Sequence, residues 1–270
     1  MRKDGPLLPP AGEPRLSGKD FVSALQKGLE VLTCFHREAA RLTLSDVARR
    51  TGSTPASARR SLHTLHALGY LERDGRYFRV APRALLVAHA FLASRPTPQL
   101  AQPHLDGLAE RTRESATLGQ WLDDDVVIVA RSTARRSLST GLGIGSRLPG
   151  YCSSLGRVLL ASLPPAEARR RVERMDRVPL TARTAWRTPA VLALVDRCRE
   201  LGWAESDGEL ELDVRSLAVP VFDREGSAVG AMSMAVRAER MTMAEFRTAC
   251  LPVLRRARDA LATQLPPECR

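Results

Sequence analysis

Small, polar and basic side chains recur along residues 53–64 at positions that one face of a helix would gather. Such a surface can enter the major groove of DNA, which is about 12 Å wide and admits one helix. Arginine suits that role because its guanidinium group pairs with phosphate oxygens and with guanine edges. We therefore expect DNA contacts from eight residues of this segment: Ser53, Thr54, Ala56, Ser57, Arg59, Arg60, His63 and Thr64.

Two helices joined by a short turn must hold this face in place. Thr43 followed three residues later by Asp46 is typical of a capping box, and Gly52 ends the helix that they open. Thr54 as cap and Pro55 at the first helical position then predict a second helix. The apolar residues expected on the inward faces are Leu44, Val47, Ala48, Ala58, Leu62 and Leu65.

A short β-hairpin should follow the second helix, over residues 70–80. Asp74 and Gly75 are a strong hairpin signal, and the neighbouring Arg73 and Arg76 would contact DNA phosphates. Taken singly, these arginines would indicate only a solvated basic face. Together with the order of helix, turn, helix and hairpin, they predict a winged helix-turn-helix.

Charge and composition agree with a DNA-binding chain. The net charge of the 270 residues is +11, and the first 80 residues carry +6 of it, with 14 basic against 8 acidic side chains. Basic charge concentrated in one region is what an electrostatic DNA footprint requires. The five cysteines form no CxxC pair, and no apolar run is long enough for a membrane span. We expect reduced thiols in a soluble, cytoplasmic protein of two domains.

The chain on either side of the motif divides into a leader, a first helix and a linker. The proline- and glycine-rich residues 1–19 are expected to be disordered. The winged domain is placed at residues 20–81 and a linker helix at residues 82–96, ended by Pro96 and Pro98. The first helix of the winged domain should turn an apolar stripe inward: Val22, Leu25, Leu29, Leu32 and Phe35.

Residues 97–266 change to a mixed α+β pattern. Strands joined by hairpins and flanked by helices suggest a sensory module around a small pocket. Helices are expected near residues 100–113, 153–162, 165–175, 189–201 and 242–264, and strands near residues 116–122, 126–130, 217–222 and 229–236.

Two segments in this region carry a resemblance. GLGIGSRLPGYCSSLGRVLLASLP (residues 141–164) and ELELDVRSLAVPVFDREGSAVGAMSMAV (residues 209–236), behind a winged helix-turn-helix, resemble the IclR family of bacterial transcriptional regulators. RLPGYCSSLGRVLLA and RSLAVPV are most similar to the group that regulates aromatic-acid catabolism, the protocatechuate, 4-hydroxybenzoate and β-ketoadipate regulators. The resemblance runs from about Phe21 to Leu265.

This resemblance implies a GAF-like effector domain that binds a small organic acid and alters operator binding. The residues supply a physical reason, because Ser153 or Ser154 can cap a helix whose free amides would attract a carboxylate. The positions that the family would use are the backbone at Leu148, Ser154 and Leu155 and the side chains at Ser206, Ser216, Ser233 and Ala235. Small residues facing a tightly packed sheet are the plainer interpretation of Ser216 and Ser233.

Two of these positions depart from the glyoxylate-responsive pattern of the family. Ser206 stands where an aspartate occurs and Ala235 where a serine occurs. The loss of polarity favours an aromatic or longer acid over a small, highly polar one. Arg147 beside the pocket loop could contact the acid or lie on the surface.

Catalytic and redox functions must be weighed against regulation. Cys152 before a helix N-terminus could be a nucleophile or a redox switch, but His104 has no reason to approach it as a base. His63 and His66 have no third metal ligand nearby, so we expect no metal and no cofactor. The alternating acids at Glu205, Asp207, Glu209, Glu211 and Asp213 should line one face of an extended, solvated segment.

A purely architectural DNA protein would need only the first 80 residues, so a sensory domain better explains the rest of the chain. We expect a homodimer or tetramer on a pseudo-palindromic operator, because one recognition helix reads only a short site. The sequence leaves open the acid, the operator, the target genes, and whether the effector activates or represses.

Overall fold

The computed structural model describes residues 20–36, 39–134 and 141–266. The chain divides into two compact units, Met1–Ala93 and Ser94–Arg270. The expected disordered leader at residues 1–19 lies outside the described residues.

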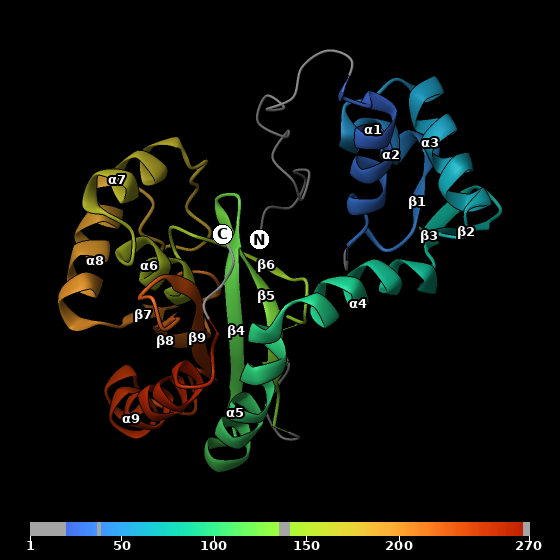
Figure 1. Ribbon diagram of the computed structural model, residues 1–270. Coiled ribbons are helices and arrows are strands. Elements are labelled where there is room, and N and C mark those ends of the chain that lie inside the picture. The colour runs from blue at the N-terminus through green and yellow to red at the C-terminus, as the bar shows by residue number, and fades with distance from the viewer. Residues whose placement is uncertain (1–19, 37–38, 135–140, 267–270) are drawn as a thin grey trace. The chain divides into compact units, whose positions relative to one another are not determined.

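The first unit is a winged helix-turn-helix (Figure 1). Its helices are α1 (Ser23–Thr33), α2 (Leu44–Thr51) and α3 (Pro55–Ala67), and its antiparallel sheet has the order β1 (Leu42–Thr43), β3 (Tyr77–Val80) and β2 (Leu71–Asp74). The predicted caps are present. Thr43 and Asp46 form the capping box of α2, Gly52 ends that helix with a φ of 62°, and the Thr54 side chain caps α3.

The inward stripe predicted for α1 is wrong for its first three members. Val22, Leu25 and Leu29 are 60%, 62% and 52% exposed, whereas Leu32 and Phe35 pack partly against the core. The residues of this segment that the core buries are Val31 and Cys34. The spacing correctly predicted an apolar face on α1. It did not predict that the first half of this face is exposed and not packed against the core of the first unit.

The linker region contains a short 3-10 turn, η3 (Pro82–Ala84), and then α4 (Leu85–Ser94). α4 is apolar all round, yet it buries none of its residues, and Leu85 and Leu86 are 69% and 61% exposed. α4 ends before Pro96, but the proline opens α5 (Pro96–Thr112) after the single residue Arg95. The next helix therefore begins four residues earlier than the expected start near residue 100, because proline is tolerated in a first helical turn.

The second unit is built on one antiparallel sheet of six strands in the order β6-β5-β4-β9-β8-β7 (Figure 1). Their bounds are β4 (Ser115–Leu122), β5 (Asp125–Ser132), β6 (Arg147–Pro149), β7 (Ala204–Asp207), β8 (Val214–Phe222) and β9 (Ala228–Arg237). The remaining helices are α6 (Ser154–Ala161), α7 (Pro165–Arg174), α8 (Thr188–Leu201) and α9 (Met243–Ala262). The short edge strands β6 and β7 were not predicted.

The two faces of this sheet pack against different helices. α5 and α9 cover one face, α6 covers the other, and α8 packs on α6 (Figure 1). Leu217, Met232 and Met234 belong to the core under α5 and α9, whereas Ala218 and Ala231 belong to the core under α6. Side chains alternate between the two faces along a strand. Strand residues directly before or after Leu217, Met232 and Met234 therefore face α6. No helix among the described residues is long and apolar enough to cross a bilayer.

Candidate DNA-binding surface and effector site

The outer face of α3 carries most of the residues expected to read DNA. Thr54, Ala56, Arg59, Arg60, His63 and Thr64 are exposed, and Ser53 is half-buried. Within the described part of the chain, no ion pair is recorded for Arg59 or Arg60, so neither guanidinium group is neutralised by a neighbouring carboxylate.

Ser57 was expected on this outer face, but its side chain is buried, with 9% of the residue exposed. It lies beside Ala58 on the side of α3 that packs into the unit. Successive residues of an α-helix are about 100° apart around its axis. Ser57 therefore lies at the boundary between the outer and inner faces of α3, where neighbouring residues can cover a small side chain.

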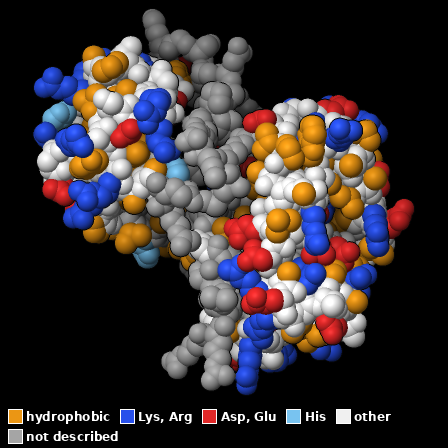
Figure 2. Space-filling model, turned by 180° about the vertical axis from the view of Figure 1, so that it is seen from behind, with side chains coloured by type: hydrophobic (Ala, Val, Ile, Leu, Met, Phe, Trp, Pro, Cys, Tyr) orange, Lys and Arg blue, Asp and Glu red, His pale blue; other side chains and the backbone are white. Residues whose placement is uncertain are grey.

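The wing is a tight hairpin between β2 and β3. Asp74 pairs with Tyr77, which leaves Gly75 and Arg76 as a two-residue loop, and the φ of 58° at Gly75 suits glycine. The Arg73 guanidinium donates to the Gly75 carbonyl (2.8 Å), while Arg76 donates to the Tyr77 hydroxyl (3.1 Å). Figure 2 shows blue Lys and Arg side chains spread over the visible face of this unit, with few red acidic ones between them.

In the second unit, the N-terminus of α6 presents two buried amides. The Ser153 hydroxyl caps the helix by accepting the Gly156 N–H (3.0 Å), so the remaining free donors of the first turn are the N–H groups of Ser154 and Leu155. Both residues are 2% exposed. Among the described residues, no hydrogen-bond acceptor is recorded for either amide. Buried donors of this kind normally have a partner, and a carboxylate is a suitable one.

Two glycines hold the preceding loop directly against this helix turn. A Cβ at Gly156 would lie 2.1 Å from the Gly150 carbonyl oxygen, and a Cβ at Gly150 would lie 2.7 Å from the Asp124 carbonyl oxygen. Neither position can carry a side chain without moving backbone. The approach of the loop fixes the direction in which the Ser154 and Leu155 amides point.

The sheet under α6 is lined by small side chains and hydroxyls. The Ser216 hydroxyl on β8 shares a hydrogen bond with the Ser154 hydroxyl on α6 (2.8 Å). Ser216 lies opposite Ser206 on β7 and opposite Ala235 on β9. We call the α6-facing residues of these strands the sheet floor: Ala204, Ser206, Ser216, Ala218, Ser233, Ala235, Ser115 and Thr117.

The structure thus brings together most of the positions that the family resemblance implies. Ser154, Leu155 and Ser216 meet at the α6 N-terminus, and Ser233 and Ala235 belong to the same floor. Leu148 on β6 packs partly against the α6 core. The Ser206 hydroxyl instead donates to the Cys152 carbonyl (3.1 Å), so in this structure it anchors the loop.

A buried ion pair beside the site was not foreseen. Arg157 on α6 donates two hydrogen bonds to the Glu209 carboxylate (2.6 and 2.5 Å) and one to the Glu205 carbonyl (3.0 Å). The Glu209 carboxylate also accepts the Ala185 N–H (3.0 Å). The side chains of Arg157 and Glu209 are only 2% and 10% exposed. The pair fastens the turn between β7 and β8 to α6, and a lone charge inside the apolar run SLGRVLLA was the available signal.

The expectation of a solvated acidic face at residues 205–213 is wrong. Four of the five carboxylates are paired with arginine, and Glu209 is buried, because the segment forms β7 and a tight turn against α6. The partners are Arg247 for Glu205 (3.4 Å), Arg215 (2.9 Å) and Arg183 (3.3 Å) for Asp207, Arg157 for Glu209, and Arg237 for Asp213. Paired catalytic carboxylates are not formed by these residues.

Arg147 is engaged in ion pairs, and Cys152 is buried in the core. The Arg147 side chain is 9% exposed and pairs with Asp125 (3.0 Å) and Asp123 (3.7 Å) at the edge of the sheet. Cys152 is fully buried, and burial raises the pKa of its thiol to about 12. A thiol of that pKa is almost never a thiolate at neutral pH, which removes the basis for the nucleophile and redox-switch alternatives.

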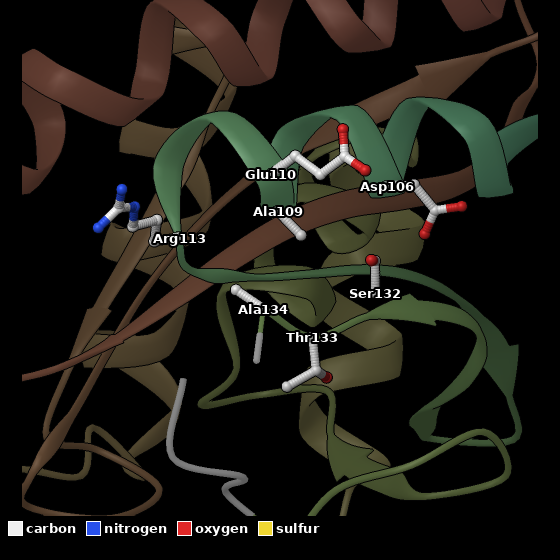
Figure 3. A pocket seen from close by; sticks show the side chains of 7 residues that line it. All are labelled: Asp106, Ala109, Glu110, Arg113, Ser132, Thr133 and Ala134. Carbon is white, nitrogen blue, oxygen red and sulfur yellow. The ribbon is translucent and has the colours of Figure 1, made fainter. Parts of the chain in front are cut away.

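The described residues also border a cavity of about 610 Å³ between α5 and the end of β5, shown in Figure 3. Asp106 and Glu110 extend from α5, the Arg113 side chain at the end of that helix points away from both, and Ser132 and Thr133 lie opposite. None of the expected effector residues lines it. Two carboxylates against one guanidinium group disfavour an organic acid there, so the acid is not assigned to this cavity.

Metal binding finds no support either. His66 Nδ1 lies 3.0 Å from the Leu71 carbonyl oxygen, and the His63 ring packs edge-on against Phe78. In the part of the chain that the structure describes, no three His, Cys, Asp or Glu side chains are grouped to hold a metal ion.

Known proteins resemble both units. Residues 24–75 match the IclR helix-turn-helix domain, and residues 89–263 match the C-terminal domain of bacterial IclR transcriptional regulators. The Pca regulon regulatory protein of Pseudomonas putida is 37% identical over 247 residues, 91% of this chain and 85% of that protein. The crystal structure of a protein described as a transcriptional regulator in Rhodococcus sp. RHA1 is 37% identical, with a TM-score of 0.78 over 91% of this chain and 98% of that one.

A third similarity concerns the second unit. The inducer-binding domain of the transcription factor PobR from Acinetobacter, a double mutant in complex with 3-hydroxybenzoic acid, is 28% identical, with a TM-score of 0.59 over 62% of this chain and 98% of that chain. The family models together with a 37% identical full-length relative identify this chain as a member of the IclR family of bacterial transcriptional regulators.

Proposed function

We propose that an organic acid with an aromatic ring controls the binding of this regulator to its operator. The observation that carries the proposal is the pair of Ser154 and Leu155 amides, which belong to buried residues and have no acceptor among the described residues, at the helix end where the Ser154 hydroxyl bonds the Ser216 hydroxyl. A carboxylate would accept both N–H groups and gain from the helix dipole. The bound hydroxybenzoic acid of the PobR domain supports an aromatic ligand.

The sheet floor favours a flat, largely apolar body behind the carboxylate. Ala204, Ala218 and Ala235 offer only methyl groups, and Ser233 contributes a single hydroxyl. Ligand sites are typically apolar with a few placed polar groups. A highly polar two-carbon acid would leave this surface without complementary contacts.

DNA is the proposed partner of α3 and the wing. Exposed polar side chains between positions 53 and 64 would contact base edges and phosphates. Arg73 and Arg76 of the wing would contact neighbouring phosphates. Residues 20–81, 82–96 and 97–266 would serve as the DNA-binding, linker and effector-binding parts of a cytoplasmic regulator.

A homo-oligomer, at least a dimer, explains two apolar surfaces of the first unit. α1 exposes Leu25 and Leu29, and α4 exposes Leu85 and Leu86. A helix that is apolar all round is normally buried, so a second copy is the natural cover for α4. Two-fold pairing would also place two α3 helices in successive major grooves of a pseudo-palindromic operator.

One experiment separates the two halves of the proposal. Ser216→Leu should abolish the response to aromatic acids in a fluorescence-anisotropy operator assay while leaving acid-free DNA binding intact. Arg60→Ala should weaken specific binding with unchanged folding and unchanged acid affinity. A Ser216→Leu protein that still responds would place the acid elsewhere, and an Arg60→Ala protein of full affinity would remove Arg60 from the DNA surface.

A further inference from the structure

The Trp121 ring packs against the loop of residues 150–153, which leads into α6 and which we call the Gly150 loop. Trp121 lies on β4 and packs against two cores, one containing Leu155 of α6 and the other containing Tyr151 and Cys152 of the loop. A Cβ on Gly150 would meet the edge of the ring, with the Cζ3 atom 2.7 Å and the Cη2 atom 2.9 Å away. The ring therefore blocks movement of the Gly150 backbone in its direction.

The Gly150 backbone also contacts the first turn of α6. A Cβ on Gly156 would lie 2.1 Å from the Gly150 carbonyl oxygen, so the loop and the helix already approach as closely as two backbones can. The two buried amides of the proposed carboxylate site, those of Ser154 and Leu155, belong to this same turn. Any displacement of Gly150 would therefore change the packing of the turn that presents these amides.

Arg171 on α7 keeps the Trp121 ring in place. Its guanidinium carbon lies 4.0 Å from the centroid of the ring, within the range of a cation–π interaction. The same guanidinium group donates to the Asp123 carbonyl and lies 3.8 Å from the Asp124 carboxylate, which fastens α7 to the turn after β4. In that turn the Asp124 carbonyl accepts the Gly150 N–H (3.2 Å). The ring and the turn therefore restrain the same glycine.

We infer that Trp121 is a positioning residue of the effector site. Its ring holds the Gly150 loop against α6 and so keeps the two buried amides of the first turn aligned for a carboxylate. Alignment matters because a hydrogen bond weakens steeply once its angle falls below about 120°. The ring acts through the loop and not by touching the acid. This inference rests on the proposed effector site at Ser154, Leu155 and Ser216.

Hydrogen exchange followed by mass spectrometry tests the restraint on the full-length protein without any ligand. Trp121→Ala should speed amide exchange in the peptide covering residues 150–156 by roughly tenfold, because losing a packed ring lowers the cost of local opening. Exchange in β8 should stay unchanged, since a general weakening of the whole unit would speed both segments. Trp121→Phe should restore most of the protection, because a phenyl ring still fills the space beside Gly150.

Isothermal titration calorimetry with benzoate and 3-hydroxybenzoate tests the consequence for binding. Trp121→Ala should weaken the affinity for both acids by roughly 10- to 100-fold, the contribution of one charge-assisted hydrogen bond. Trp121→Phe should keep most of the affinity. Trp186→Ala is the matched control, because the Trp186 ring also lies beside an arginine, Arg187 (5.5 Å), but is 38% exposed. The control should change neither the affinities nor the exchange of residues 150–156.

Three outcomes would overturn the inference. Unchanged exchange of residues 150–156 in Trp121→Ala would mean that the ring does not hold the loop, and a loss of acid affinity would then come from direct contact. Faster exchange with full acid affinity would mean that the position of the loop does not govern binding. A wild-type chain that binds neither acid would refute the proposed effector site itself, whereas the first two outcomes refute only the role of Trp121, so the failures are distinguishable.

Discussion

Removing the Glu209 carboxylate should destabilise the second unit severely. The Arg157 side chain is 2% exposed, and Glu209→Ala would leave its charge with only the hydrogen bond to the Glu205 carbonyl. Two charge-assisted bonds of 2.6 and 2.5 Å would be lost, and the Ala185 N–H would lose its acceptor. Breaking a buried ion pair from one side costs about 3–5 kcal/mol, a large part of a typical stability of about 5–15 kcal/mol.

Thermal and urea unfolding followed by tryptophan fluorescence measure this loss, because Trp203 belongs to the core of the same unit. For a unit of this size, about 3–5 kcal/mol corresponds to a melting-temperature drop of roughly 6–20 °C. The control replaces both partners. Arg157→Met with Glu209→Leu fills similar volume without charge and should recover most of the loss, since apolar replacement of a whole buried pair is often neutral.

Two results would refute this reasoning. The first is a loss of unfolding free energy below about 1 kcal/mol in Glu209→Ala. An exposed ion pair would give a loss of that size, so the result would mean that water reaches Arg157. A double variant as unstable as the single one would mean that the charges are required for the fold and not only for each other.

Three further predictions concern other parts of the chain. Cys152 should resist iodoacetamide at pH 8 in the native protein and react in urea, because burial raises its pKa to about 12, and labelling as fast as a free thiol would contradict that burial. Gly156→Ala should abolish acid binding in calorimetry, because its Cβ would meet the Gly150 carbonyl oxygen at 2.1 Å, whereas Gly107→Ala meets nothing within 4 Å and serves as control. Leu25→Glu combined with Leu86→Glu should shift the protein toward monomer in sedimentation velocity, and an unchanged sedimentation coefficient would locate the oligomer interface elsewhere.

Local signals predicted the helices of this chain well because their physical causes are local. The capping box at Thr43 and the proline after Thr54 act within one turn, and the structure has both helices where they were expected. The short strands β6 and β7 escaped because they are three and four residues long, and their pairing depends on distant partners.

The errors share one cause, which is that a pattern identifies a face but not what covers it. Leu25 and Leu29 repeat as a core stripe would, yet they are exposed in this unit. Glu209 alternates with other acids as a solvated residue would. It is nevertheless buried, and its carboxylate pairs with Arg157, which lies 52 residues away in the sequence.

The sheet floor has a consequence for how such regulators diversify. The residues under α6 are mostly alanine and serine, so their side chains contribute only one or two heavy atoms each to the surface below that helix. At the proposed effector site, a single codon change at Ala218 or Ala235 would alter which acid fits and would leave the proposed DNA-binding residues of α3 unchanged. After gene duplication, two copies could therefore keep one operator while responding to different nutrients, and selection would need only a few substitutions on one surface to separate them.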